Sequence, residues 1–147
     1  MTRRAFTPLL AAAAATAVAS TPSVAFSNRV HLTLHPKFRE KFVWCLSEVL
    51  GCGAPVSPRS GEVVANLDQP ILAFGFPGGG SVSVEFSEAA LDEKQIRRAA
   101  WLEIKTPDAA ALKKKILDAG FEQIHHPATS TFYFPLPGGQ VIGVMQS

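Results

Sequence analysis

The same four-residue turn occurs twice in this chain, as Phe76-Pro77-Gly78-Gly79 and as Leu136-Pro137-Gly138-Gly139. Glycine adopts a positive φ without steric cost, so Pro-Gly-Gly predicts a tight turn at both places. A strand-like run follows each turn, over residues 81–86 after the first and 140–146 after the second. The repeated turn therefore predicts two copies of one structural unit.

Each half also contains one predicted helix. Residues 36–50 carry apolar side chains at three- and four-residue spacings, and Gly51 follows as a stop signal. In the second half, Thr106 is the predicted N-cap and Pro107 suits the first helical position. Gly120 is the predicted end of this second helix.

A strand-like run precedes each helix and three runs follow it, so each unit has the order strand, helix, three strands. The eight runs are residues 29–34, 62–67, 71–76 and 81–86 in the first half, and 99–105, 121–125, 131–135 and 140–146 in the second. The sequence therefore predicts an α+β fold of two βαβββ modules, residues 28–86 and 99–147. We expect the modules to form one curved, eight-stranded mixed sheet with both helices on its outer face.

The composition is that of one packed domain, with 147 residues, 47% hydrophobic and 18% charged. The formal net charge is +2, and Arg3 and Arg4 near the N-terminus account for the excess. The run Lys113-Lys114-Lys115 is interpreted as a solvated helix face. Without a basic stripe the domain lacks the electrostatic footprint of nucleic-acid-binding proteins, and this class is excluded.

Residues 1–27 have the features of a leader in front of the domain. An arginine-containing start is followed by an uncharged run and by Ala17-Val18-Ala19, a cleavage pattern of signal peptides. Residues 2–6 also resemble a twin-arginine export signal. These features predict an exported protein, periplasmic or extracellular; the alternatives are an organelle transit peptide and an over-long start before a cytoplasmic protein. The apolar run is too short for a membrane span, so none is predicted in the mature form.

Strand alternation predicts which side chains face a pocket, because successive residues of a strand point to opposite sides of the sheet. Apolar residues such as Val30 and Leu32 pack toward the helix, and the residues between them face the other side. The predicted pocket residues are His31, Thr33, Ser83, Glu85, Trp101, Glu103, Gly143 and Met145. Polar, charged and aromatic groups beside small residues are typical of a small-molecule pocket. The alternative is the solvated side of an antiparallel sheet.

Two pairs of neighbouring or closely spaced residues are left outside this pocket. His125 and His126 point to opposite faces of a regular strand, so they are interpreted as surface histidines. Cys45 and Cys52 are too few for a disulfide framework and are predicted to be free thiols.

The order of these features resembles the vicinal oxygen chelate superfamily, which includes glyoxalases, bleomycin-resistance proteins, fosfomycin-resistance proteins and extradiol dioxygenases. The resemblance covers about residues 29–146. It rests on His31 in the first strand, Val49-Leu50-Gly51 after the first helix, Trp101-Leu102-Glu103-Ile104 leading into Pro107, and the closing Leu136-Pro137-Gly138-Gly139-Gln140-Val141-Ile142-Gly143.

The resemblance implies a divalent metal on the pocket face, with ligands on the first and last strand of each unit. His31 fits the first of these places. The three other places fall on Trp101, Ser83 and Gly143. Glu85 and Glu103 lie on the same face, so a shifted set of His31, Glu85 and Glu103 could hold Fe, Mn, Ni or Zn. If this set does not form, no cofactor is expected.

Two functions remain open at this point. The first is a small-molecule-binding protein with a degenerate metal site, in which Trp101, Tyr133 and Met145 hold an apolar or aromatic ligand. The alternative is a metal-dependent glyoxalase-like lyase or extradiol-type dioxygenase that uses the shifted ligand set. The resemblance also implies a homodimer in which residues of two chains share each site.

Overall fold

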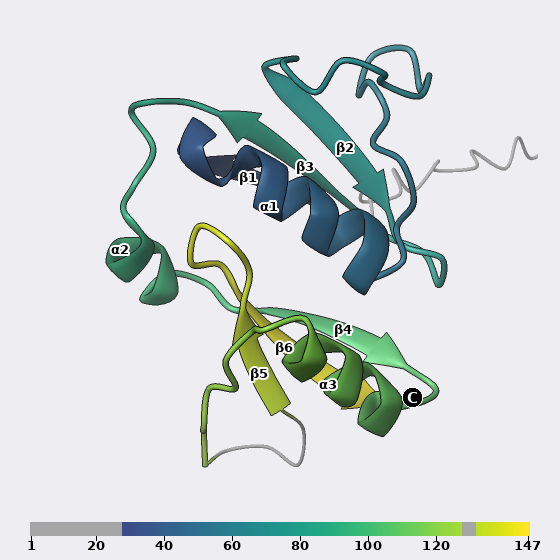
Figure 1. The fold of residues 1–147 in the computed structure, drawn as a ribbon, viewed down its shortest axis with the longest axis vertical. Coiled ribbons are helices and arrows are strands. Elements are labelled where there is room, and N and C mark those ends of the chain that lie inside the picture. Colours follow the sequence, from purple (N-terminus) through teal and green to yellow (C-terminus); the bar gives the residue numbers. More distant parts are fainter. Residues whose placement is uncertain (1–27, 128–131) are drawn as a thin grey trace, which may run out of the picture.

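The computed structural model describes residues 28–127 and 132–147 (Figure 1). The predicted leader, residues 1–27, lies outside the described residues, as does Thr131 at the start of a predicted strand. In the described part of the chain, no helix is long and apolar enough to cross a membrane.

The first half forms a three-stranded sheet with a helical segment on one side (Figure 1). Its elements are β1 (Arg29–Leu34), η1 (Pro36–Phe38), α1 (Arg39–Trp44), η2 (Cys45–Val49), β2 (Ile71–Gly75) and β3 (Ser81–Phe86). The strand order is β1-β3-β2, with β1 parallel and β2 antiparallel to β3. The predicted helix over residues 36–50 is therefore present, but it changes pitch from a 3-10 turn to α and then to π.

The second half repeats this arrangement after a short connecting helix. Its elements are α2 (Glu93–Arg97), β4 (Leu102–Thr106), α3 (Ala109–Asp118), β5 (Phe132–Pro135) and β6 (Val141–Gln146). The strand order is β4-β6-β5, again with one parallel and one antiparallel pair. The N-cap prediction for α3 was wrong: Asp108, not Thr106, caps the helix, because its Oδ1 accepts from the Ala111 amide at 2.8 Å.

The predicted eight-stranded sheet is not confirmed. The six strands described form two separate three-stranded sheets. Of the run over residues 62–67, only Val63 makes a single bridge, to Val56, and Val56 in turn bridges Ala73 of β2. Val63 is 68% exposed, so burial does not stabilise a strand there. In the run over residues 121–125, Ile124 alone pairs, with Tyr133.

No strand of one half pairs with a strand of the other among the strands described, and the helical segments of the two halves contact each other. The ring of Trp44 in α1 stacks on Phe121, which follows α3, with 6.1 Å between centroids. The Lys115 ammonium of α3 donates to the Glu48 carbonyl at 2.6 Å. Buried residues of both halves form one hydrophobic core. The helical segments thus contact each other where the halves meet, and the exposed side chains of His31 and Glu85 lie on the other side of the first sheet.

The two Pro-Gly-Gly turns form as predicted, but their surroundings differ. Gly79 and Gly139 have similar positive φ angles, 99° and 95°. A Cβ atom at Gly79 would meet nothing within 4 Å, whereas one at Gly139 would lie 2.6 Å from the Glu93 carbonyl oxygen. A Cβ at Gly138 would lie 2.7 Å from the Leu34 side chain. The second turn is therefore wedged against the first half and against α2, while the first turn is free.

Candidate functional site: a polar face and an aromatic face

The predicted pocket residues lie on the two open sides of the sheets. We call the open side of the first sheet the polar face, formed by His31, Thr33, Ser83 and Glu85. We call the open side of the second sheet the aromatic face, formed by Trp101, Glu103, Tyr133, Gly143 and Met145. Burial alternates along β3, where Val82 and Val84 are buried and Glu85 is exposed, as the predicted directions require. In β5 and most of β6 every residue is buried, so burial does not separate the two sides of these strands.

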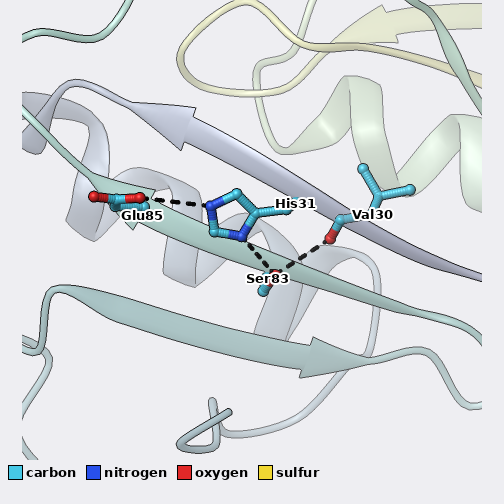
Figure 2. Close-up of polar contacts among 4 residues, drawn as sticks. All are labelled: Val30, His31, Ser83 and Glu85. Carbon is cyan, nitrogen blue, oxygen red and sulfur yellow. Dashed lines mark hydrogen bonds and ion pairs between the residues drawn. The ribbon is translucent and has the colours of Figure 1, made fainter.

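On the polar face, His31 lies between Ser83 and Glu85 (Figure 2). Its Nδ1 is 2.9 Å from the Ser83 hydroxyl oxygen, and its Nε2 is 3.6 Å from Glu85 Oε2. The imidazole comes from β1 and both partners come from the neighbouring strand β3, where His31 is in register with Ser83. The side chains of His31 and Glu85 are about half exposed, 49% and 48%.

The hydrogen bonding of Ser83 determines what His31 can do. Ser83 Oγ also donates to the Val30 carbonyl at 3.4 Å, and a hydroxyl has one proton. When the Ser83 hydroxyl proton points to the Val30 carbonyl, the hydroxyl oxygen can only accept from His31 Nδ1–H. In the neutral imidazole, Nε2 is then an acceptor. Nε2 and the Glu85 carboxylate are then two acceptors that face each other, 3.6 Å apart. Such a pair suits a proton or a cation between the two atoms.

The aromatic face carries a cluster of three rings. The Trp101 ring centroid is 5.1 Å from that of Tyr133 and 5.1 Å from that of His126. The His126 and Tyr133 centroids are 5.5 Å apart, with the rings inclined at 74°. The Trp101 indole N–H donates to the Arg97 carbonyl at 3.0 Å, which fixes the indole orientation. Trp101 remains 39% exposed, so the cluster presents an aromatic surface to solvent.

Gly143 allows Tyr133 to lie across this face. The two residues are directly opposite each other in the antiparallel pair β5–β6. A Cβ atom at Gly143 would lie 2.7 Å from Tyr133 Cε1, so the tyrosine ring occupies the space that a side chain would take. Glu103 is in register with Gly143 on its other side, which places its exposed carboxylate on the same face as the rings.

The register also corrects the alignment of the two halves. Ser83 and Gly143 each lie four residues beyond the second glycine of their turn. On the first strands, Ser83 pairs with His31, and Gly143 pairs with Glu103. The counterpart of His31 is therefore Glu103, whereas the sequence alignment gave Trp101, two residues earlier. Both first-strand positions consequently carry a side chain able to bind a metal.

The three predicted ligands, His31, Glu85 and Glu103, are not brought together within one chain. His31 and Glu85 face each other on the polar face, while Glu103 lies on the aromatic face of a different sheet. Among residues 28–127 and 132–147, no three His, Cys, Asp or Glu side chains are close enough to hold one metal ion. The residues of a single chain thus offer two ligands where a stable site needs at least three.

The remaining predicted residues contribute less. Thr33 is exposed at the end of the polar face, in register with Glu85. Met145 is partly buried and in register with Lys105. His126 is the functional candidate that the sequence analysis missed. Its only sequence signal was its spacing of two residues from Ile124, which forms an isolated bridge with Tyr133.

The two cysteines do not supply a nucleophile. Both are free, as predicted. Burial, with a smaller contribution from the charge of Cys52, raises the pKa of the Cys45 thiol to about 12. Burial also raises the pKa of Cys52, to about 11. Both groups therefore stay protonated near neutral pH, in the unreactive thiol form.

Comparison with known proteins establishes the fold. No family model matches the chain, and no curated protein matches it. Solved structures do match, and they show that the chain has the fold of vicinal oxygen chelate proteins. One is a glyoxalase family protein from Bacillus anthracis, 13% identical, with a TM-score of 0.61 over 85% of this chain and 97% of that one.

Two further solved structures have the same fold. A glyoxalase/dioxygenase from Nostoc punctiforme is 16% identical, with a TM-score of 0.60 over 85% of this chain and 97% of that one. A fosfomycin resistance protein from Listeria monocytogenes is 10% identical, with a TM-score of 0.60 over 85% of this chain and 93% of that one.

Proposed function

We propose that this chain is a small-molecule-binding protein of the vicinal oxygen chelate superfamily with a degenerate metal site. The observation that carries the proposal is the ring cluster of Trp101, Tyr133 and His126 on the second sheet, in which Tyr133 is buried while Trp101 and His126 are exposed. Rings offer large, rigid contact area to a planar ligand at low entropic cost. The separation of Glu103 from His31 and Glu85 supports binding without a resident metal in one chain.

The test measures the binding of planar aromatic compounds by equilibrium dialysis. Trp101→Ala removes the largest ring of the cluster, and we expect it to weaken binding at least tenfold. Trp44→Ala is the matched control, because Trp44 is similarly exposed, at 42%, but lies on α1. Equal affinities in the two variants would rule out the aromatic face as the binding surface.

We further propose that the protein acts as a homodimer. In the part of the chain that the structure describes, β1 pairs only with β3 and β4 only with β6. Each of these strands therefore has one backbone edge available to a second copy. Light scattering should give twice the mass of one chain, and a monomeric mass at micromolar concentration would contradict the proposal.

The second candidate is a metal-dependent lyase or dioxygenase. It is favoured by the facing of His31 Nε2 and Glu85 Oε2, which leaves room for a cation. In a homodimer, Glu103 of the second copy would be the third ligand. This candidate predicts stoichiometric Fe, Mn, Ni or Zn in the purified protein and its loss in Glu85→Gln. Glu88→Gln is the control, because Glu88 pairs with His35 instead. A metal-free protein that still binds aromatic compounds would leave only the first proposal.

A further inference from the structure

The aromatic face combines its rings with one carboxylate. Glu103 is exposed and lies on the same side of the sheet as Gly143 and Tyr133, with which it shares a row across the strands. Trp101 lies just before β4, two residues from Glu103, and its ring contact with Tyr133 at 5.1 Å places the indole beside the same face. A ligand that rests on the indole is therefore within reach of the carboxylate.

This carboxylate has no cation of its own. In residues 28–127 and 132–147, the ion pairs are His31–Glu85, His35–Glu88 and Lys114–Asp118, and Glu103 is in none of them. Lys105 is the nearest lysine along β4, two residues further from Trp101, and it is exposed. The negative charge thus remains available to a ligand beside the indole.

Aromatic rings favour the same sign of ligand charge as Glu103 does. The face of an indole attracts cations, more strongly than that of any other side chain, within about 6 Å of the ring. An anionic ligand would meet the negative ring face and the carboxylate together. The polar face shows the same preference, since its charged group is Glu85.

From these observations we infer that the ligand of the aromatic face is a small organic cation with a planar aromatic ring. The ring stacks on the Trp101 cluster, and the positive charge lies beside Glu103. This inference rests on the proposed function, because it names the class of ligand for the same surface.

The experiment compares three probes of similar size: N-methylquinolinium as the cation, quinoline at pH 8 as the neutral ring, and naphthalene-2-sulfonate as the anion. Binding is measured by quenching of tryptophan fluorescence in a Trp44→Phe variant. The sequence has two tryptophans, so this variant keeps Trp101 alone. Equilibrium dialysis checks the same affinities independently. We expect the cation to bind about tenfold more tightly than quinoline at low salt, and the anion to bind most weakly.

Glu103→Gln separates charge from stacking. It should remove the cation preference while leaving the affinity for quinoline unchanged, and Lys105→Met should leave the preference intact. Glu62→Gln, in the first half, is the control for net charge and should have no effect. Equal binding of cation and neutral ring by the unaltered protein, or tightest binding of the anion, would overturn the inference and leave the proposed function standing. Absence of binding by all three probes to folded protein would overturn both.

Discussion

The central residue of the last strand differs between the two halves, and so does the whole face around it. Ser83 in β3 holds the His31 ring through its hydroxyl. Gly143, at the same place in β6, leaves its space to the Tyr133 ring. The serine side chain thus occurs on the polar face, and the glycine without a side chain occurs on the aromatic face. The comparison teaches that two sheets of the same topology can present faces of different chemistry through the residue at their centre.

The turns that lead into these strands differ in a second way. Gly79 is surrounded by open space, while Gly139 lies against the backbone of α2. A side chain at Gly79 would therefore meet backbone strain alone, whereas one at Gly139 would also collide with the Glu93 backbone.

The largest expected effect tests this difference between the turns. Gly79→Ala and Gly139→Ala introduce the same strain, because both glycines have a positive φ. Gly139→Ala also forces a methyl group against the Glu93 backbone, which cannot rotate away. We expect it to lower the free energy of unfolding by about 3 kcal/mol more than Gly79→Ala, measured by urea denaturation. Equal losses would show that the second turn is not constrained.

The next effect tests the centre of the strands. Gly143→Ser places a side chain where the Tyr133 ring lies, so the ring must move and the aromatic cluster must open. We expect a loss of about 1–2 kcal/mol and a changed near-ultraviolet circular dichroism spectrum. Ser83→Ala, on the half-exposed polar face, should cost within about 0.5 kcal/mol. An unchanged spectrum in Gly143→Ser would contradict the role given to this glycine.

A third difference is that both thiols belong to the first half. The pKa of Cys45 is about 12 in the folded protein, against the ordinary value of 9.0. Between these values the unfolded chain loses the thiol proton and the folded chain keeps it, so stability falls as pH rises above 9. We expect a loss of about 1 kcal/mol between pH 8 and pH 10. The slope should be smaller in Cys45→Ala, and an identical slope would show that other groups cause the loss.

The smallest effect concerns the contact between the helices. Lys115 donates to the Glu48 carbonyl of the other half, while Lys114 pairs only with Asp118 of its own helix. We expect Lys115→Met to cost about 0.5–1 kcal/mol in thermal or urea unfolding, and Lys114→Met less than about 0.5 kcal/mol. Equal effects would mean that Lys115 acts only as a surface charge.

Local patterns in the sequence were sufficient for most of the fold. Both turns, both long helices and the alternating burial along β1, β3 and β4 follow from glycine positions and from spacing. The arrangement of the two halves did not follow, because contacts such as Trp44 on Phe121 join residues far apart in the chain. Without them, a single eight-stranded sheet was as consistent with the pattern as two sheets.

The sequence predicted on which side of its strand each site residue lies, but not which of these residues lie close together. Alternation placed His31, Glu85 and Glu103 on open faces correctly. It could not show that Glu103 lies on a different sheet from His31, nor that His126 joins Trp101 and Tyr133. The predicted counterpart of His31, Trp101, and the observed one, Glu103, are two residues apart. A shift of two residues keeps a side chain on the same side of the strand, so alternation alone could not detect it.

The wedged second turn also affects how the protein is made. Leu34, near the start of the domain, packs against Gly138, near its end. A ribosome that has released only the first module has released a sheet whose core is still incomplete. The Leu34 side chain gains this contact only when the second turn has been made, so the core of the first module is completed by a residue of the second.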